Sequence, residues 1–245
     1  MPVAKPLVGV CGVDTATKLS AASAGRLAAA SVPVPVAGGV APIRFVTRYV
    51  SLGPASPGDL DAAETAAILG AGLALVVVQH VRYPGWAASG QLGAVDGQHA
   101  ALNAEEAGYP GNLTPDEPTL SLVCDLEGVA NTGAPVAEYV DAWCLAVAGA
   151  GYTPVLYVGY KCGLTPAELY SLPHVSRYWC DAGPRSVAVR GFCAKQHPQV
   201  TIAGVLVDPD YAYTDALGGT LVGLSGDSVA RDTDPAPASG PDEAA

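Results

Sequence analysis

Residues 119–128 read TLSLVCDLEG, and this stretch decides the fold that we expect. It has the length and the aliphatic content of a buried strand, whose side chains alternate between two faces. One face carries Leu120, Leu122, Cys124 and Leu126, and the opposite face carries Ser121, Val123, Asp125 and Glu127. Two carboxylates therefore share one face at the carboxyl end of the strand, with Cα atoms roughly 6.5–7 Å apart.

Outward from this strand, short β-branched runs alternate with alanine-rich stretches. The alternation is typical of parallel strands joined by crossover helices. The expected strands are Val8–Asp14, Arg44–Val50, Leu73–Val81, Thr119–Gly128, Pro154–Tyr160, Ser176–Ala182, Gly191–His197 and Gly204–Asp210. Eight parallel strands close a barrel at about this chain length. The sequence therefore predicts an α/β fold, an irregular TIM-type (β/α)8 barrel.

Helices are expected between the earlier strands, at Ser20–Ala30, Asp61–Leu69, Gln91–Ala107, Pro135–Ala148 and Thr165–Leu172. Asp61 with Glu64, and Thr165 with Glu168, have the spacing of capping boxes, and Gly70 is expected to stop the second helix. The fourth helix has an apolar stripe formed by Val136, Val140, Trp143 and Val147. After the sixth strand the gaps are too short for full helices, so the helices there are short or missing and the last strands are joined by loops or run partly antiparallel.

The domain organisation follows from composition. We expect one barrel domain over residues 1–224 and a small, polar, acidic tail over residues 225–245 that does not fold. The segment Ser31–Pro42 is rich in Pro and Gly and is expected to be a loop.

Charge and hydropathy exclude several classes of partner. The 245-residue chain has a formal net charge of −11, which argues against nucleic acid and anionic membrane surfaces and favours a neutral or cationic ligand. Its apolar runs are too short for a membrane span. Residues 1–14 lack the features of a signal peptide, so we expect synthesis in the cytoplasm without classical export. The six Cys match no zinc spacing, and we expect mostly buried thiols, with a Cys162 disulfide to Cys180 or Cys193 as the first pairing to check.

Carboxylates also close the first and last expected strands. Asp14 ends the first strand, and Asp208 and Asp210 share one face at the end of the eighth. Barrel enzymes place their catalytic groups at this rim, and crowded carboxylates raise the pKa of at least one of them. A protonated carboxylic acid beside an ionised one is the chemistry of glycoside hydrolysis. A helix N-cap is the structural alternative for Asp14.

The chain resembles a known family through six motifs in order. They are GVDTATKL, FVTRYVS, CDLEG, YVGY, YWCDAG and KQHPQVTIAGVLVDPDYAYTDALGG, spread over residues 8–218. This order is similar to the DUF1906, Rv2525c-like glycoside hydrolase-like domain, a family distantly similar to the Asp-x-Glu lysozymes of glycoside hydrolase family 25.

The resemblance implies roles for the matched positions. Glu127 would be the general acid, and Asp125 would orient the N-acetyl group of the sugar or stabilise charge, in a substrate-assisted retaining mechanism. Asp14 and Asp208 would flank the sugar and tune the pKa of Glu127. The positions that would bind the substrate are Tyr49, Tyr157, Trp179, Gln196 and Asp210. Asp181, where a small residue is common, either adds a charge to the site or faces the helices.

Two functions of different classes remain open at this stage. The first is a lysozyme- or muramidase-like glycosidase acting on N-acetylated glycans such as peptidoglycan, without a cofactor. The second is an inactive glycan- or cell-wall-binding module, because a fold does not establish activity. A metal-using amidase or deacetylase is a weaker third reading; no spacing of a metal site is present, and none is expected. Either main function implies work at the cell envelope, outside the cell or in a phage particle.

Overall fold

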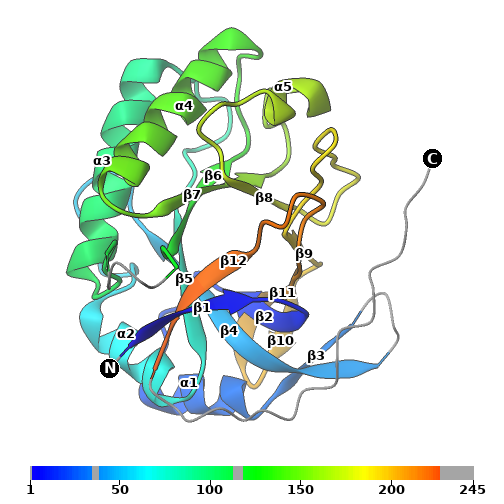
Figure 1. Cartoon of the computed structure of the whole chain (residues 1–245). Helices are drawn as coiled ribbons and strands as arrows, with labels where there is room; N and C mark the ends of the chain where they lie inside the picture. The colour runs from blue at the N-terminus through cyan, green and yellow to red at the C-terminus, as the bar shows by residue number, and fades with distance from the viewer. Residues whose placement is uncertain (1, 35–38, 113–117, 227–245) are drawn as a thin grey trace.

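The computed structural model describes residues 2–34, 39–112 and 118–226, in which the central strands close into a barrel (Figure 1). In spatial order the barrel strands are β2 (Val10–Asp14), β4 (Val40–Val50), β5 (Ala74–Gln79), β6 (Ser121–Leu126), β7 (Thr153–Val158), β8 (Arg177–Cys180), β9 (Ala194–Gln196) and β11 (Val205–Ala212), which returns to β2. Each expected strand overlaps one of these eight. The prediction of an irregular TIM-type barrel is therefore confirmed.

The last strand of the barrel runs against its neighbours. All other neighbouring barrel strands are parallel, whereas β11 is antiparallel to both β9 and β2. Only residues 197–204 separate β9 from β11, and part of them forms β10 (Val200–Ile202), which folds back on β11 as a hairpin. A parallel crossover needs a longer connection, so the chain reverses direction here.

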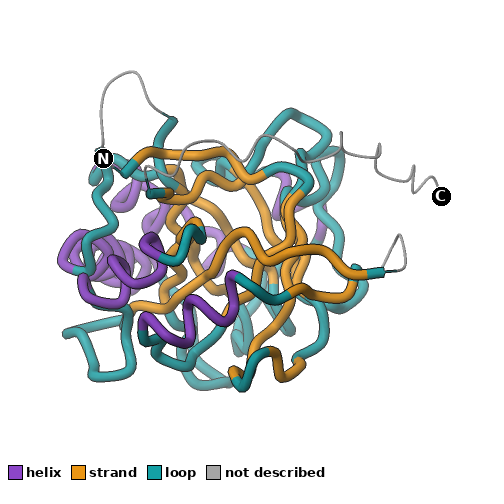
Figure 2. The backbone as a smooth tube through the Cα atoms, turned by 90° about the horizontal axis from the view of Figure 1, so that it is seen from below, coloured by secondary structure: helices purple, strands orange, loops and turns teal. Residues whose placement is uncertain are grey.

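The five expected helices are present: α1 (Ala21–Ala28), α2 (Ala62–Gly70), α3 (Gly90–Glu106), α4 (Ala134–Gly149) and α5 (Pro166–Tyr170). Most of the helical turns lie on one side of the ring of strands, as Figure 2 shows. The capping box of Thr165 and Glu168 is confirmed at α5. At α2 the Asp61 side chain accepts a hydrogen bond from the Glu64 backbone, but the Glu64 side chain accepts from Leu19 and completes no capping box. Gly70 is the last residue of the helix and does not stop it, so the predicted capping box and the predicted stop were both wrong.

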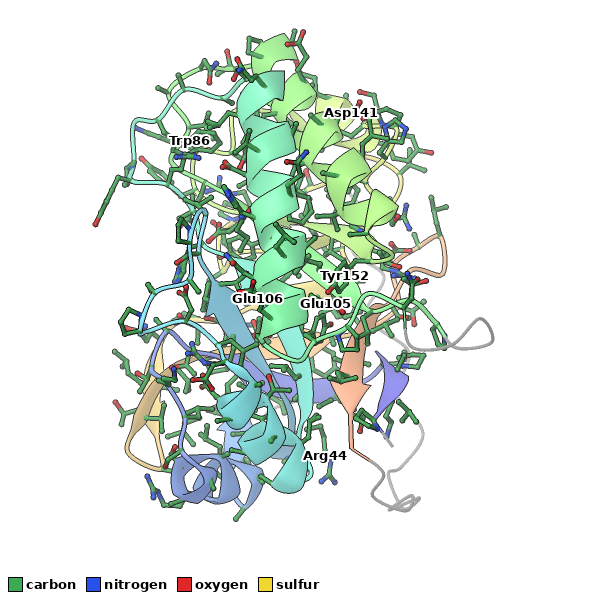
Figure 3. All side chains as sticks on the ribbon, turned by 90° about the vertical axis from the view of Figure 1, so that its left-hand side faces the viewer. Arg44, Trp86, Glu105, Glu106, Asp141 and Tyr152 are labelled. Carbon is green, nitrogen blue, oxygen red and sulfur yellow. The ribbon has the colours of Figure 1, made fainter. Side chains whose placement is uncertain are left out.

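Helices α3 and α4 pack closely against each other, as Figure 3 shows, with Asp141 on the outer side of α4 and Glu105 at the end of α3 near Tyr152. A Cβ atom on Gly93 would lie 2.0 Å from the carbonyl oxygen of Tyr139, so only glycine permits this approach. The predicted apolar stripe of α4 is buried.

Strands that the sequence did not reveal close the molecule further. β1 (Val3–Leu7) pairs with β12 (Leu221–Ser225), and β12 pairs with β5 through Leu224 and Leu75. β3 (Ser31–Pro33) forms a hairpin with the start of β4, so the expected loop Ser31–Pro42 was wrong at both ends; residues 35–38 lie outside the described residues. Val32 is buried in this hairpin, which gives the strand its driving force.

Two separate apolar clusters confirm the predicted faces of the central strand. Val123 lies in the cluster inside the barrel, whereas Leu122, Cys124 and Leu126 lie in the outer cluster beneath the helices. All six cysteines, which lie within the described residues, are buried free thiols, so the considered Cys162 disulfide is not formed.

Over the part of the chain that the structure describes, no helix combines the length and apolar character of a membrane span. Ser225 is the last residue of β12, and residues 227–245 of the predicted tail lie outside the described residues.

Candidate active site

A cavity of about 210 Å³ opens at the carboxyl ends of the parallel strands. It is lined by Tyr49, Val78, Asp125, Glu127, Tyr157, Trp179, Gln196 and Asp208. All site residues expected from the sequence line this cavity except Asp14 and Asp210, which are buried directly behind its wall. The structure therefore brings the predicted set together in one place.

The alternation of side chains along β6 places Asp125 and Glu127 on the face that points into the cavity. Asp125 is in register with Tyr157 on β7, and Glu127 follows the end of β6. The backbone of Glu127 is fixed because the indole Nε1 of Trp86 donates to its carbonyl oxygen at 2.9 Å. Both carboxyl groups thus face the cavity from a rigid part of the barrel.

Asp14 is held by a chain of hydrogen bonds across the barrel mouth. The Tyr49 hydroxyl donates to its Oδ1 at 2.8 Å, and the Gln196 amide donates to its Oδ2 at 2.6 Å. The Tyr157 hydroxyl in turn donates to Gln196 Oε1 at 2.6 Å. The alternative role of Asp14 as a helix cap is excluded, because Ser20 caps α1.

Asp208 reaches the rim by a different route from the expected one. It does not close a parallel strand; it lies within β11, which enters the barrel from the rim. The antiparallel register places Asp208 opposite Asp14, and Asp210 one step deeper, opposite Gly12 and Gln196. The carboxylates converge as predicted, and the antiparallel course of β11 is one of the two arrangements left open for the last strands.

Crowding and burial keep these carboxyl groups in their protonated forms to unusually high pH. Burial raises the pKa of Asp14 to about 7, and the charge of Asp208 adds to the rise, against hydrogen bonds from Gln196 and Tyr49. Burial, then the charges of Glu127 and Asp14, raise the pKa of Asp125 well above its usual range. Burial also raises the pKa of Glu127 and of Asp208.

Asp210 is almost completely enclosed. Its side chain is 1% exposed, and neither carboxyl oxygen has a hydrogen-bond partner among the described residues. Burial and the charges of Asp14 and Asp208 raise its pKa well above the usual range. A neutral carboxylic acid fits this position, because an ionised one would be buried without compensation. Asp210 lies behind the cavity wall, not on it, so the predicted direct contact with substrate is not available to it in this structure.

Of three residues beside Glu127, Gly159 and Arg185 were not recognised as part of the site, and the role of Asp181 was left open. Gly159 leaves room for it, because a Cβ there would lie 2.5 Å from Glu127 Oε2. Asp181 raises the pKa of Glu127 and Arg185 lowers it, after the larger effect of burial, and the two bind each other at 3.2 Å. Of the two roles left open for Asp181, the charge near the site is correct. Gly159 and Asp181 lie in the quoted motifs YVGY and YWCDAG, which was the available signal.

A buried ion pair outside the barrel stabilises the end of β2, the strand that carries Asp14. Arg48 Nε lies 2.7 Å from Glu64 Oε1, and both side chains are almost fully buried. Arg48 also donates to the carbonyl oxygen of Thr15, next to Asp14, at 2.5 Å, and Glu64 accepts from the backbone of Leu19 at 2.6 Å. The pair therefore fixes the segment that carries Asp14.

This fold and this ring of carboxyl groups define a glycoside hydrolase-like barrel. The chain belongs to the family described as the Rv2525c-like, glycoside hydrolase-like domain, whose sequence model matches residues 39–199. The resemblance inferred from the six motifs is thereby confirmed. No curated protein matches the chain in sequence.

Solved structures share the fold at low sequence identity. An uncharacterized B. stearothermophilus protein is 18% identical, with a TM-score of 0.59 over 83% of this chain and 95% of that chain. The Mycobacterium tuberculosis Tat-secreted protein Rv2525c, in complex with L-tartrate, is 14% identical, with a TM-score of 0.57 over 86% and 98%. A muramidase from Trichobolus zukalii is 15% identical, with a TM-score of 0.50 over 83% and 93%. At these identities the likeness concerns the fold.

Proposed function

We propose that this protein is a glycosidase that cleaves N-acetylated glycans, with peptidoglycan as the favoured substrate class, Glu127 as the general acid and Asp125 assisting. The observation that carries the proposal is the pair of carboxyl groups of Asp125, in β6, and Glu127, just after its end, both with a raised pKa and both lining a cavity of about 210 Å³. A raised pKa keeps a carboxylic acid able to donate its proton near neutral pH.

Asp125 supplies the second part of the proposed chemistry. Its Oδ1 is buried without a hydrogen-bond partner among the described residues. Buried polar atoms are almost always paired, so this oxygen favours a ligand that brings a donor, such as the amide N–H of an N-acetyl group. Accepting that hydrogen bond stabilises ionised Asp125 and turns the acetyl carbonyl toward the anomeric carbon.

The proposed reaction has two steps. The Glu127 proton passes to the glycosidic oxygen as its bond to the anomeric carbon breaks, and the acetyl oxygen of the same sugar bonds to that carbon. Water then attacks the anomeric carbon, gives a proton to the ionised Glu127 and releases the acetyl oxygen, so the configuration is retained. Asp208 flanks the sugar, and Asp14, buried behind the cavity wall, acts on the cavity through its hydrogen bonds with Tyr49 and Gln196.

The aromatic and amide side chains of the cavity fit the binding of a sugar ring. Trp179 and Tyr157 meet edge to face with ring centroids 5.2 Å apart, and Trp179 Nε1 has no hydrogen-bond partner among the described residues. Gln196 and Tyr49 also line the cavity and connect to Asp14. These groups would stack on the sugar and bind its hydroxyl groups.

Incubation with peptidoglycan and soluble chitooligosaccharides tests the proposal. Wild type and Glu138→Gln, an exposed glutamate of α4 as matched control, should release reducing ends, and Glu127→Gln should not. Glycan binding without release, equal in wild type and Glu127→Gln, would instead establish the second function, an inactive glycan- or cell-wall-binding module. If the protein neither binds nor cleaves these glycans, both functions are contradicted.

The proposed substrate places the work of the protein at the cell envelope, outside the cell or in a phage particle. The similar protein Rv2525c is Tat-secreted, which supports action beyond the cytoplasm. Fractionation of cells that produce the protein would test this proposal.

A further inference from the structure

A second hollow of about 600 Å³ adjoins the cavity, and Glu127 lines both. Its other walls come from the loops that follow β5, β6 and β7, and its lining residues are Val81, Arg82, Pro84, Gly85, Gly128, Val129, Ala130, Thr132, Tyr160, Lys161 and Gly163. None of these residues has a part in the proposed reaction. A general acid that protonates a bridging oxygen lies between the two halves of its substrate, so a hollow on the other side of Glu127 faces the leaving half.

The hollow has a rigid floor because backbone hydrogen bonds join its three loops. Gly128 donates to the Tyr160 carbonyl at 2.7 Å, Val129 to that of Lys161 at 3.0 Å, and Gly85 to that of Gly128 at 2.7 Å. Lys161 adopts φ 53°, which non-glycine residues seldom do, and the bond from Val129 holds it there. The shape is therefore built into the barrel and does not depend on a ligand.

The wall carries an aromatic platform and two cations. Tyr160 is 61% exposed although it lines the hollow, and the Lys161 ammonium lies 5.3 Å from the centre of its ring. No carboxylate of the described residues forms an ion pair with Lys161, whereas Arg82 is fixed by Asp96 at 2.5 Å. Two cations at one hollow are notable in a chain with 12 Lys and Arg and a net charge of −11.

We propose that this hollow binds the leaving-group half of the glycan, with Tyr160 stacked on a sugar ring and Lys161, assisted by Arg82, binding a carboxylate substituent of the glycan. The proposal rests on the proposed function for the role of Glu127 and names the substrate class more closely. Apolar wall area suits a sugar face, and the cations favour an acidic glycan over a neutral one.

Equilibrium binding in the Glu127→Gln background, which prevents cleavage, tests the inference. The probes are a neutral tetrasaccharide of N-acetylglucosamine and a tetrasaccharide that alternates N-acetylglucosamine with the carboxylate-bearing N-acetylmuramic acid. Tyr160→Ala should weaken binding of both by about tenfold or more, and Lys161→Ala should weaken only the acidic one, so that the preference is lost. Tyr170→Ala and Lys5→Ala, exposed residues outside the hollow, should change neither Kd.

The outcomes separate this inference from the proposed function. Unchanged Kd values in Tyr160→Ala and Lys161→Ala would overturn the inference even if the wild-type protein cleaves the glycan. Weakened binding in these variants without any cleavage by wild type would uphold the hollow as a binding site and contradict the glycosidase. A failure of both probes to bind would overturn the inference and, together with absent cleavage, the proposed function.

Discussion

Asp14 and Asp208 lie opposite each other in register on the antiparallel strands β2 and β11, where their charges oppose each other at the barrel mouth. This relationship exists only because β11 enters from the rim. Together with burial, it keeps Asp14 protonated far above the pH at which an exposed aspartate ionises.

Stability should depend on pH through Asp14. In the folded protein its pKa is about 7, whereas the unfolded chain has a value near 3.9. Between these values the folded state holds a proton that the unfolded state has released, so the contribution of Asp14 to the free energy of unfolding falls as pH rises, by at most about 1.4 kcal/mol per pH unit, and becomes constant above pH 7.

Urea denaturation of wild type and Asp14→Asn at pH 5, 6, 7 and 8 measures this dependence. The difference in free energy of unfolding, wild type minus variant, should decrease from pH 5 to 7 and then level off. For Asp61→Asn the difference should stay flat, because hydrogen bonding to Lys18 keeps the pKa of Asp61 below its usual range. A difference for Asp14 that rises with pH would contradict the assigned burial of its charge.

The proton affinity of Glu127 should respond in opposite directions to its two charged neighbours. Asp181→Asn removes a negative charge and should lower the pKa of Glu127, while Arg185→Gln removes a positive charge and should raise it. Carbon NMR of the Glu127 carboxyl during a pH titration measures both shifts without relying on activity. Arg26→Gln, on the exposed side of α1, should leave the pKa unchanged. Shifts of the same sign in the two site variants would refute the placement of these charges.

Gly159→Ala should impair catalysis far more than stability. The added Cβ would lie 2.5 Å from Glu127 Oε2 and 2.7 Å from its Cβ, so the side chain of Glu127, the proposed general acid, must move. Displacement of a catalytic group by about 1 Å lowers kcat on the order of 100-fold. Steady-state kinetics on peptidoglycan and thermal denaturation measure the two effects. Gly149→Ala, whose Cβ would meet no atom within 4 Å, is the control, and equal activity of both variants would show that Glu127 tolerates the methyl group.

The Arg48–Glu64 pair should matter for stability where a surface pair does not. Arg48→Met leaves the Glu64 charge buried without its partner and should cost about 3–5 kcal/mol of unfolding free energy. Lys18→Met breaks the pair with Asp61, whose side chains are 40% and 50% exposed, and should cost less than about 1 kcal/mol. Chemical denaturation of both variants gives the comparison. Similar small losses in the two variants would contradict the expected cost of leaving Glu64 buried without Arg48.

Local pattern was sufficient for the elements and for the faces of the central strand. The alternation of TLSLVCDLEG placed Asp125 and Glu127 inside the barrel and Cys124 outside it, as the structure has them. Strand alternation is a property of the backbone at each residue, so it needs no knowledge of distant partners. Strands β1 and β12 were missed because their pairing depends on distant segments, whereas β3 was missed because it lies in a stretch rich in Pro and Gly that was interpreted as a loop.

The sequence by itself determined the barrel, its five helices and the acids that end its first and fourth strands, because periodicity and strand-end position are local properties. Only the tertiary structure decided that β11 is antiparallel to β2, that the Gln196 amide donates a hydrogen bond to Asp14 across the barrel mouth, and that Gly159 and Asp181 lie next to Glu127. These relationships join residues far apart in the chain, and closure of the barrel, which fixes the register of every strand against its neighbours, is what brings them together.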